Sequence, residues 1–245
     1  MFTSYLRAVK AESLKLKRSP VWLAFFALPM ISAFFGTMNY KMNLGVLKSE
    51  WYSLWSQHSL FLCYFFMPAL IGTYCSYLWR LEHTRHNWNS FLTAPLPLSS
   101  LYLGKLTQAI RVSILGNLWI FALFFICGKL AGIQSPFPRE ALEWFLCGTV
   151  GAVVVCCVQL LLSLIIRSFA VPIGIALAGG ILGLYMTNHD YGMNYPYSIY
   201  CLGMRANNPN MEISISTLVV NSLGYIIIFA VLSVFYLRRH EIAAT

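Results

Sequence analysis

Glu82, His83 and His86 have the residue types and spacing that catalysis or metal binding would need. They stand in a polar stretch, WRLEHTRHNWNSFLTAPLPLSS (79–100), between two long apolar runs. In zinc hydrolases the order H-E-x-x-H puts both imidazoles on one helical face, whereas the order here is E-H-T-R-H. A catalytic zinc also needs a third protein ligand, and the other histidines lie far away along the chain. We therefore interpret these residues as solvated polar groups of a cytoplasmic helix, with no metal and no catalytic role.

The rest of the sequence shows no other catalytic or energy-converting motif. The isolated pair Gly104 and Lys105 is not a phosphate-binding loop, which requires G-x-x-x-x-G-K-[ST]. His58 is expected outside the bilayer, and no acidic residue or other histidine is expected deep in an apolar run. Buried ionisable groups mark functional sites in membranes, so an intramembrane protease and an ion-coupled transporter are both disfavoured. Any ATP-driven work must use a nucleotide site on another chain.

The composition places the chain in a membrane. Of its 245 residues 58% are hydrophobic and 10% are charged, against about 25% charged in a soluble domain. Six apolar runs are near or above the ~17 to 25 residues that cross a bilayer as a helix. They cover, approximately, residues 20–38, 58–78, 108–128, 142–166, 171–187 and 217–237. Because only helices and closed barrels satisfy the backbone in lipid, we predict an all-α membrane protein with six spans in one domain, 1–245.

The distribution of charge predicts the orientation. An even number of spans puts both termini on one side, and short loops rich in Lys and Arg stay in the cytoplasm. With both termini inside, the inner side carries the whole net charge of +9. Lys105 is expected to project into the cytoplasm, and Arg111 to lie at the inner interface with its charge reaching toward water. A basic inner rim explains the charge without a nucleic acid as partner.

Residues 2–18, FTSYLRAVKAESLKLKR, predict an amphipathic helix at 3.6 residues per turn. Its mostly apolar arc consists of Phe2, Tyr5, Leu6, Val9, Ser13 and Leu16. Its basic residues are Arg7, Lys10, Lys15, Lys17 and Arg18. We expect this helix to rest on the inner leaflet with its basic face toward anionic lipid head groups.

The third span has a clear helix start. Pro95 and Pro97 end the polar stretch, and Ser99 or Ser100 can cap the helix that follows. This helix continues into the third apolar run, so it is expected to be longer than the bilayer is thick.

Small and polar residues within the spans have two interpretations. Gly179 and Gly183 belong to a small-xxx-small pattern in the fifth run, which favours close helix packing. The polar residues at mid-span depth are Asn117, Gln159 and Asn221. They either bond across helices, which we favour, or line a substrate pathway. The outer connection 188–216 either contains re-entrant or interfacial helices or is a loop that lies on the membrane.

A helix over 82–93 would present Trp88, Phe91 and Leu92 on one face, at i, i+3 and i+4. An exposed apolar patch with polar neighbours is typical of a partner site, and an aromatic residue near an arginine is a common anchor. The competing interpretation is a short helix that lies on the inner membrane surface.

Two segments, SYLRAVKAESLKLKRSPVWL and YLWRLEHTRHNWNSFLTAPLPLSSLYLGKL, resemble the permease subunit of ABC-2 type exporters. More narrowly, the patterns ESLKLKRS and EH-x(4)-W-x(4)-TAP-x(8)-GK resemble permeases that give immunity to lantibiotics. The resemblance implies a six-helix half-transporter with an interfacial helix at 3–18, a coupling helix at 82–93 and a membrane-proximal outer region before the sixth span. The residues that it implies as contacts of the partner ATPase are Glu82, Arg85, Trp88, Phe91 and Leu92.

The same resemblance implies the partners and the function. A dimer of ABC ATPase subunits would hold ATP and Mg, and a second permease, the same or a related chain, would complete the membrane part. Together they would expel an amphiphilic antimicrobial peptide, lantibiotic or bacitracin-like, from a bacterial plasma membrane and so give immunity or resistance. The chain itself would be no enzyme. A permease for another lipid-like or drug substrate and an ATP-independent secondary transporter are the alternatives.

Overall fold

The chain folds into helices throughout the part that is described. The computed structural model describes residues 2–84 and 97–239, and within these ranges there is no strand. The helices are α1 (Phe2–Lys17), α2 (Val21–Met42), α3 (Glu50–Phe61), η1 (Leu62–Phe66), α4 (Met67–His83), α6 (Leu98–Leu130), α7 (Ala141–Ile165), α8 (Ala170–Asn188), η2 (Gly192–Asn194), α9 (Pro196–Gly203) and α10 (Ile215–Arg239). In these ranges six stretches are long and apolar enough to cross a membrane: Val21–Met42, Glu50–His83, Leu98–Leu130, Ala141–Ile165, Ala170–Asn188 and Ile215–Arg239. The predicted all-α membrane fold with six spans is confirmed.

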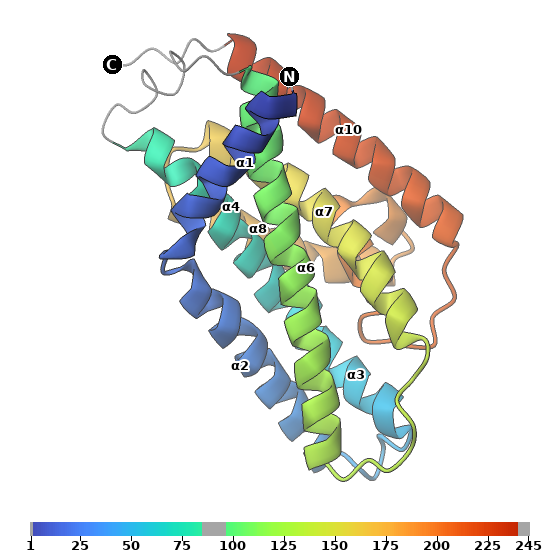
Figure 1. The fold of residues 1–245 in the computed structure, drawn as a ribbon. Coiled ribbons are helices and arrows are strands. Elements are labelled where there is room, and N and C mark those ends of the chain that lie inside the picture. The colour runs from blue at the N-terminus through green and yellow to red at the C-terminus, as the bar shows by residue number, and fades with distance from the viewer. Residues whose placement is uncertain (1, 85–96, 240–245) are drawn as a thin grey trace.

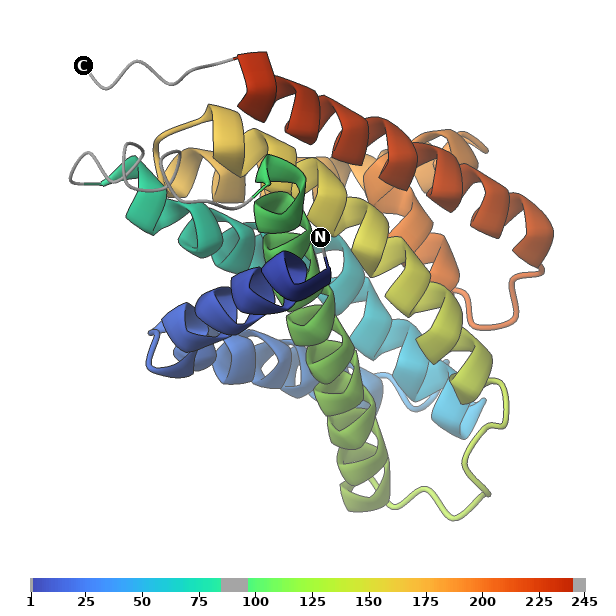
Figure 2. The same ribbon diagram turned by 45° about the horizontal axis from the view of Figure 1, so that its top comes forward.

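The two ends of the bundle are distinguished by the elements that meet there. Figure 1 shows α1 and the last turn of α10 at the same end, where α4 ends and α6 begins. We call this the inner end, following the orientation that the charge predicts, and the opposite end the outer end. Figures 1 and 2 both show α1 lying across the first half of α6, the green helix that runs through the bundle.

The second span is one continuous helical stretch, Glu50–His83, which contains the π-helical turn Leu62–Phe66. It begins before the predicted run 58–78, because three large residues of its first two turns are buried. These residues are Trp51, Leu54 and Trp55. The polar residues at 53 and 56–58 lower the local hydropathy, so the sequence alone places the start of the span too late.

His58 lies inside this long helix and is buried, with its ring Nε2 2.9 Å from Thr37 Oγ1 on α2. The sequence predicts His58 outside the bilayer, but the structure places it within the apolar helical stretch Glu50–His83 and buries it. The physical reason is the extension of the helix by two turns, which carries the imidazole into the contact between α2 and α3.

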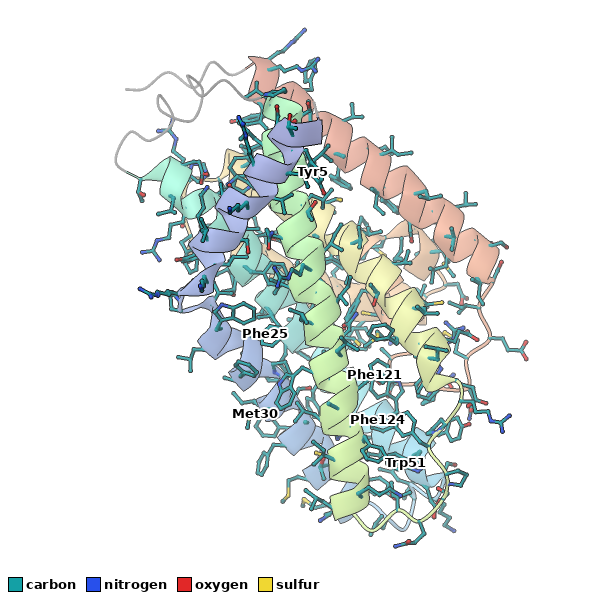
Figure 3. All side chains as sticks on the ribbon, in the orientation of Figure 1. Tyr5, Phe25, Met30, Trp51, Phe121 and Phe124 are labelled. Atoms are coloured by element: carbon teal, nitrogen blue, oxygen red, sulfur yellow. The ribbon has the colours of Figure 1, made fainter. Side chains whose placement is uncertain are left out.

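Aromatic rings hold the outer half of the bundle together. The ring centroid of Trp55 lies 4.8 Å from that of Phe121 and 4.8 Å from that of Phe124, both on α6. Trp51 contacts Phe124 edge to face at 5.2 Å, and Figure 3 shows these rings converging where α3 meets α6. The indole Nε1 of Trp55 also donates a hydrogen bond of 2.9 Å to the carbonyl of Met204. α3 is therefore anchored to α6 and to the segment that follows α9.

α6 is the long helix that the sequence predicts. Its 33 residues measure about 50 Å, well beyond the ~30 Å of a hydrocarbon core. The predicted cap at Ser99 or Ser100 is wrong, since Pro97 stands at the N-cap position and no side chain caps the helix. Proline already fixes a backbone angle suited to this position and has no N–H of its own to satisfy.

The outer connection 188–216 turns back into the helix bundle, and we call it re-entrant in this sense. Its helix α9 inserts among the spans, and every residue from Tyr197 to Gly203 is buried. Glycines of α7 make room for it: a Cβ at Gly151 would lie 2.5 Å from the Cα of Tyr200. Because the backbone of a short helix is admitted only where no side chain blocks it, the small residues of α7 determine where α9 enters.

We predict that Gly151→Ala destabilises the protein by about 1 to 3 kcal/mol, because the added methyl group overlaps the backbone of α9. Gly174→Ala is the matched control. A Cβ at Gly174 meets nothing within 4 Å, so this change should leave stability unchanged or raise it slightly. Thermal unfolding of both variants in one detergent measures the difference, and equal melting temperatures would contradict the insertion of α9.

Candidate functional site

α1 is docked on α6 at a position where the two helices approach closely. A Cβ at Gly104 would lie 3.0 Å from the Cβ of Ala8, so only glycine allows this contact without displacement. Tyr5 Oη and Thr107 Oγ1 are hydrogen-bonded at 2.8 Å. Gln108 Nε2 donates to the carbonyl of Val9 at 3.1 Å. The first helix is thus part of the folded bundle.

Four charged side chains, three of them buried and one partly exposed, form a cluster where α1, α4 and α6 meet. Lys105 Nζ lies 3.0 Å from Glu12 Oε1 and 2.8 Å from Glu82 Oε1. Lys15 Nζ lies 2.7 Å and 2.6 Å from the same two oxygen atoms. We call these four residues the charge cluster. It joins two carboxylates to two ammonium groups, so its net charge is zero.

Lys105 is the centre of the charge cluster. Its side chain is 0% exposed, and its three N–H donors find Glu12, Glu82 and the carbonyl of Leu78 at 2.6 Å. The ammonium also lies 4.5 Å from the ring centroid of Trp79, a distance suited to a cation–π contact. A buried ammonium is tolerated here because each donor is satisfied and each charge is compensated.

The pKa of Lys15 shows the effect of the two carboxylates in the charge cluster. Burial by itself lowers the pKa of an ammonium, but the carboxylates of Glu12 and Glu82 outweigh it and leave the pKa of Lys15 raised. Lys15 therefore stays protonated at neutral pH, and its pairing persists until the pH rises above the ordinary range of lysine.

The charge cluster corrects three predictions. Glu82 is buried at the end of α4, so its carboxylate holds two lysines instead of facing an ATPase. Lys105 is buried instead of projecting into the cytoplasm, and Lys15 points to Glu82 instead of to lipid. The sequence indicates one of these ion pairs, because Glu12 lies three residues before Lys15 and therefore on the same helix face.

The rest of α1 agrees only in part with the predicted amphipathic arc. Leu16 is buried and Val9 is half-buried, but Leu6 is 49% exposed. The buried face instead contains Ala8 and Glu12, which sit over Gly104 and Lys105. The basic residues that do remain exposed are Arg7, Lys10, Lys17 and Arg18.

The predicted coupling helix 82–93 is only partly within the described residues. α4 ends at His83, whose ring Nε2 lies 2.8 Å from the carbonyl of Ser163 on α7. His83 is therefore anchored to the bundle and is not a freely solvated group. The predicted contact residues Arg85, Trp88, Phe91 and Leu92 lie outside the described residues, as does His86.

A second polar cluster lies toward the outer half, around the re-entrant segment. Gln159 Nε2 donates to Tyr197 Oη at 2.6 Å, and Tyr200 Oη donates to Asn117 Oδ1 at 3.2 Å. Asn221 Nδ2 donates to the carbonyl of Met193 at 2.9 Å. The polar residues that the sequence places at mid-span depth thus all bond to the connection 188–216.

The glycines of α8 contact the same segment. A Cβ at Gly179 would lie 2.8 Å from the ring of Tyr197, and the carbonyl of Gly183 accepts a 3.2 Å hydrogen bond from Ser198 Oγ. The packing interpretation of these residues is correct, with α9 as the partner. Asn117 also donates a bond of 3.1 Å to Thr149 on α7, which joins two spans directly.

No group of three or more metal-ligating side chains that could hold a metal ion occurs among the described residues. The charge cluster and the polar contacts of α9 hold helices of the bundle to one another.

The chain matches a known protein family. The family model described as "ABC-2 family transporter protein" matches residues 8–183, which include the charge cluster and the helices from α1 into α8. No curated protein matches the chain at a significant level.

We predict that Lys105→Met lowers the free energy of unfolding by about 3 to 5 kcal/mol, since it leaves two buried carboxylates with one lysine. Lys10→Met removes an exposed charge of α1 and should change stability by less than about 0.5 kcal/mol. The double variant Glu82→Gln/Lys105→Met leaves Glu12 and Lys15 as a matched pair and should recover part of the loss. Unfolding in denaturant measures all three, and a loss no larger than that of the Lys10 variant would argue against the charge cluster.

Proposed function

Because the chain belongs to the ABC-2 family of transporter proteins, we propose that it is the permease subunit of an ATP-driven exporter. Its partner is a dimer of ATPase subunits that bind ATP and Mg, and a second permease, the same or a related chain, completes the membrane part. The family membership and the six apolar helices support a multi-pass membrane protein in transport. The positive inner rim supports a bacterial plasma membrane topology with both termini in the cytoplasm and anionic lipid around α1.

The single observation that carries the coupling proposal is the position of the charge cluster. α4 leads directly into residues 85–96, the stretch that contains the proposed docking residues Trp88, Phe91 and Leu92. The last turn of α4 holds α1 and α6 through Glu82. A push on that stretch is therefore delivered to two further helices at once.

α6 offers a route from the charge cluster to the outer half. Lys105 lies near its inner end, and Asn117, three turns further on, bonds to Tyr200 of the re-entrant helix. Close-packed interiors are stiff, so a displacement of α6 displaces α9 rather than being absorbed. Closure of the ATPase dimer on ATP would in this way reach the outer side of the membrane.

The proposed substrate is an amphiphilic antimicrobial peptide, lantibiotic or bacitracin-like, whose removal from the membrane gives immunity. The sequence patterns that resemble lantibiotic-immunity permeases support it. A cationic peptide would also meet acidic side chains at the outer end, where Glu140, Glu143 and Glu212 line one groove together with Arg205.

We predict that Trp88→Ala or Phe91→Ala abolishes copurification of the chain with the ATPase encoded beside its gene. Loss of a buried aromatic anchor costs about 2 kcal/mol or more of binding free energy, which is roughly thirtyfold in affinity. Phe34→Ala, a change of an exposed aromatic residue on α2, is the control and should leave the complex intact. A complex that survives both docking variants would contradict the proposed contact.

We also predict that cells producing the chain with its ATPase resist at least one member of a panel of lantibiotics and bacitracin. Resistance should disappear when the ATPase cannot hydrolyse ATP, because the chain has no energy source of its own. Sensitivity unchanged toward the whole panel would contradict the immunity proposal and favour another lipid-like or drug substrate. Substrate movement by the purified chain alone would support a secondary transporter instead.

A further inference from the structure

A groove of ≈ 330 Å³ lies at the inner end between the last turns of α1, the start of α2 and the middle of α6. Two basic side chains, Lys17 and Arg111, line it together with Gln108, Trp22, Leu14 and Leu115. In the described part of the chain neither Lys17 nor Arg111 forms an ion pair. Both side chains are exposed and line the same groove, so an anion placed there would be attracted by two positive charges.

The wall of this groove is rigid. Trp22 Nε1 donates a hydrogen bond of 2.8 Å to the carbonyl of Leu16, which ties the start of α2 to the end of α1. The amide of Gln108 is buried and bonded to the carbonyl of Val9. The basic side chains therefore stand on elements whose relative position is already determined.

The groove continues into an apolar strip. This strip would contact the acyl chain of a lipid, which a free anion lacks. Arg111, Leu115 and Leu118 follow at i, i+4 and i+7 on one exposed face of α6. Opposite this strip, α2 contributes Phe26, whose ring packs edge to face on Trp119 at 5.8 Å. An acyl chain laid along α6 from Arg111 would thus contact apolar side chains over its whole first half.

The groove lies at the level expected for a phospholipid head group, where the apolar part of a span begins. α2 begins at Val21, so the groove lies at the level where an apolar span starts, and its Trp22 is of the type enriched at the membrane interface. Arginine can hold a phosphate with two parallel N–H donors, and lysine adds a compact second charge.

We propose that this groove binds one anionic phospholipid, with its phosphate between Arg111 and Lys17 and an acyl chain along Leu115 and Leu118. The site is distinct from the diffuse attraction of the remaining basic residues of α1 to the inner leaflet. It does not depend on the identity of the exported substrate or of the ATPase. A bound lipid would neutralise both charges and fill the space between α1, α2 and α6 beside the charge cluster.

The test uses the purified full chain in a neutral detergent and native mass spectrometry. Phosphatidylglycerol, phosphatidylcholine, glycerol 3-phosphate and inorganic phosphate are titrated separately. We expect retention of one phosphatidylglycerol with an affinity at least tenfold above that of phosphatidylcholine, and no retention of the two water-soluble anions. Lys17→Gln/Arg111→Gln should weaken phosphatidylglycerol binding roughly 30-fold, because two basic contacts at the membrane surface are lost.

Two further variants separate this site from charge in general and from misfolding. Arg7→Gln/Lys10→Gln removes the same charges from exposed positions of α1 outside the groove and should weaken binding less than threefold. Lys17→Arg/Arg111→Lys keeps both charges and should keep binding, and melting curves confirm that each variant is folded. Equal binding of phosphatidylcholine, equal retention of free phosphate, or an equal loss in the Arg7/Lys10 variant would each overturn the proposal.

Discussion

The inner half of this protein depends on the pairing of four charges, of which Lys105, Glu12 and Glu82 are buried and Lys15 is partly exposed. Once Lys105 is buried, its ammonium must be compensated, and Glu12 and Glu82 are the carboxylates within reach. This requirement ties α1, α4 and α6 to one another more strictly than apolar packing would, because apolar contacts can slide whereas a buried charge cannot leave its partner. The N-terminal helix is consequently a structural member of the bundle, and the end of α4 cannot move without α6.

The outer half obeys the same rule with neutral groups. α9 brings backbone and hydroxyl groups into apolar surroundings, and each such group needs a partner there. Glycines on α7 and α8 let the backbone approach, while Asn117 and Gln159 supply hydrogen bonds to Tyr200 and Tyr197. α6 takes part in both halves, and it therefore connects the charged inner contacts to the re-entrant helix over a single rigid length.

Hydropathy predicted the six spans and the length of α6 correctly, since crossing a bilayer depends on the length and composition of a local run. It failed for His58, because the polar residues at 53 and 56–58 lower the average over a stretch that packing nevertheless buries. The prediction of a serine cap failed at the start of α6, where Pro97 occupies the cap position. Leu6 was misplaced because a helical wheel shows which residues share a face but not which face meets a neighbour.

The sequence by itself determined the membrane class and the number of spans, and it predicted which side of the membrane carries the positive charge. These properties depend on hydropathy and charge added over neighbouring residues, and both follow directly from the sequence. The tertiary structure alone decided that Glu82 pairs with Lys15, 67 positions away, and that Lys105 pairs with Glu12, 93 positions away. Such contacts depend on how three helices cross. The local sequence around these Lys and Glu residues would be the same if they lay on a solvated face. Charge counting predicted the inner side for these residues, but only the packing of α1 against α6 buried Glu12, Glu82 and Lys105.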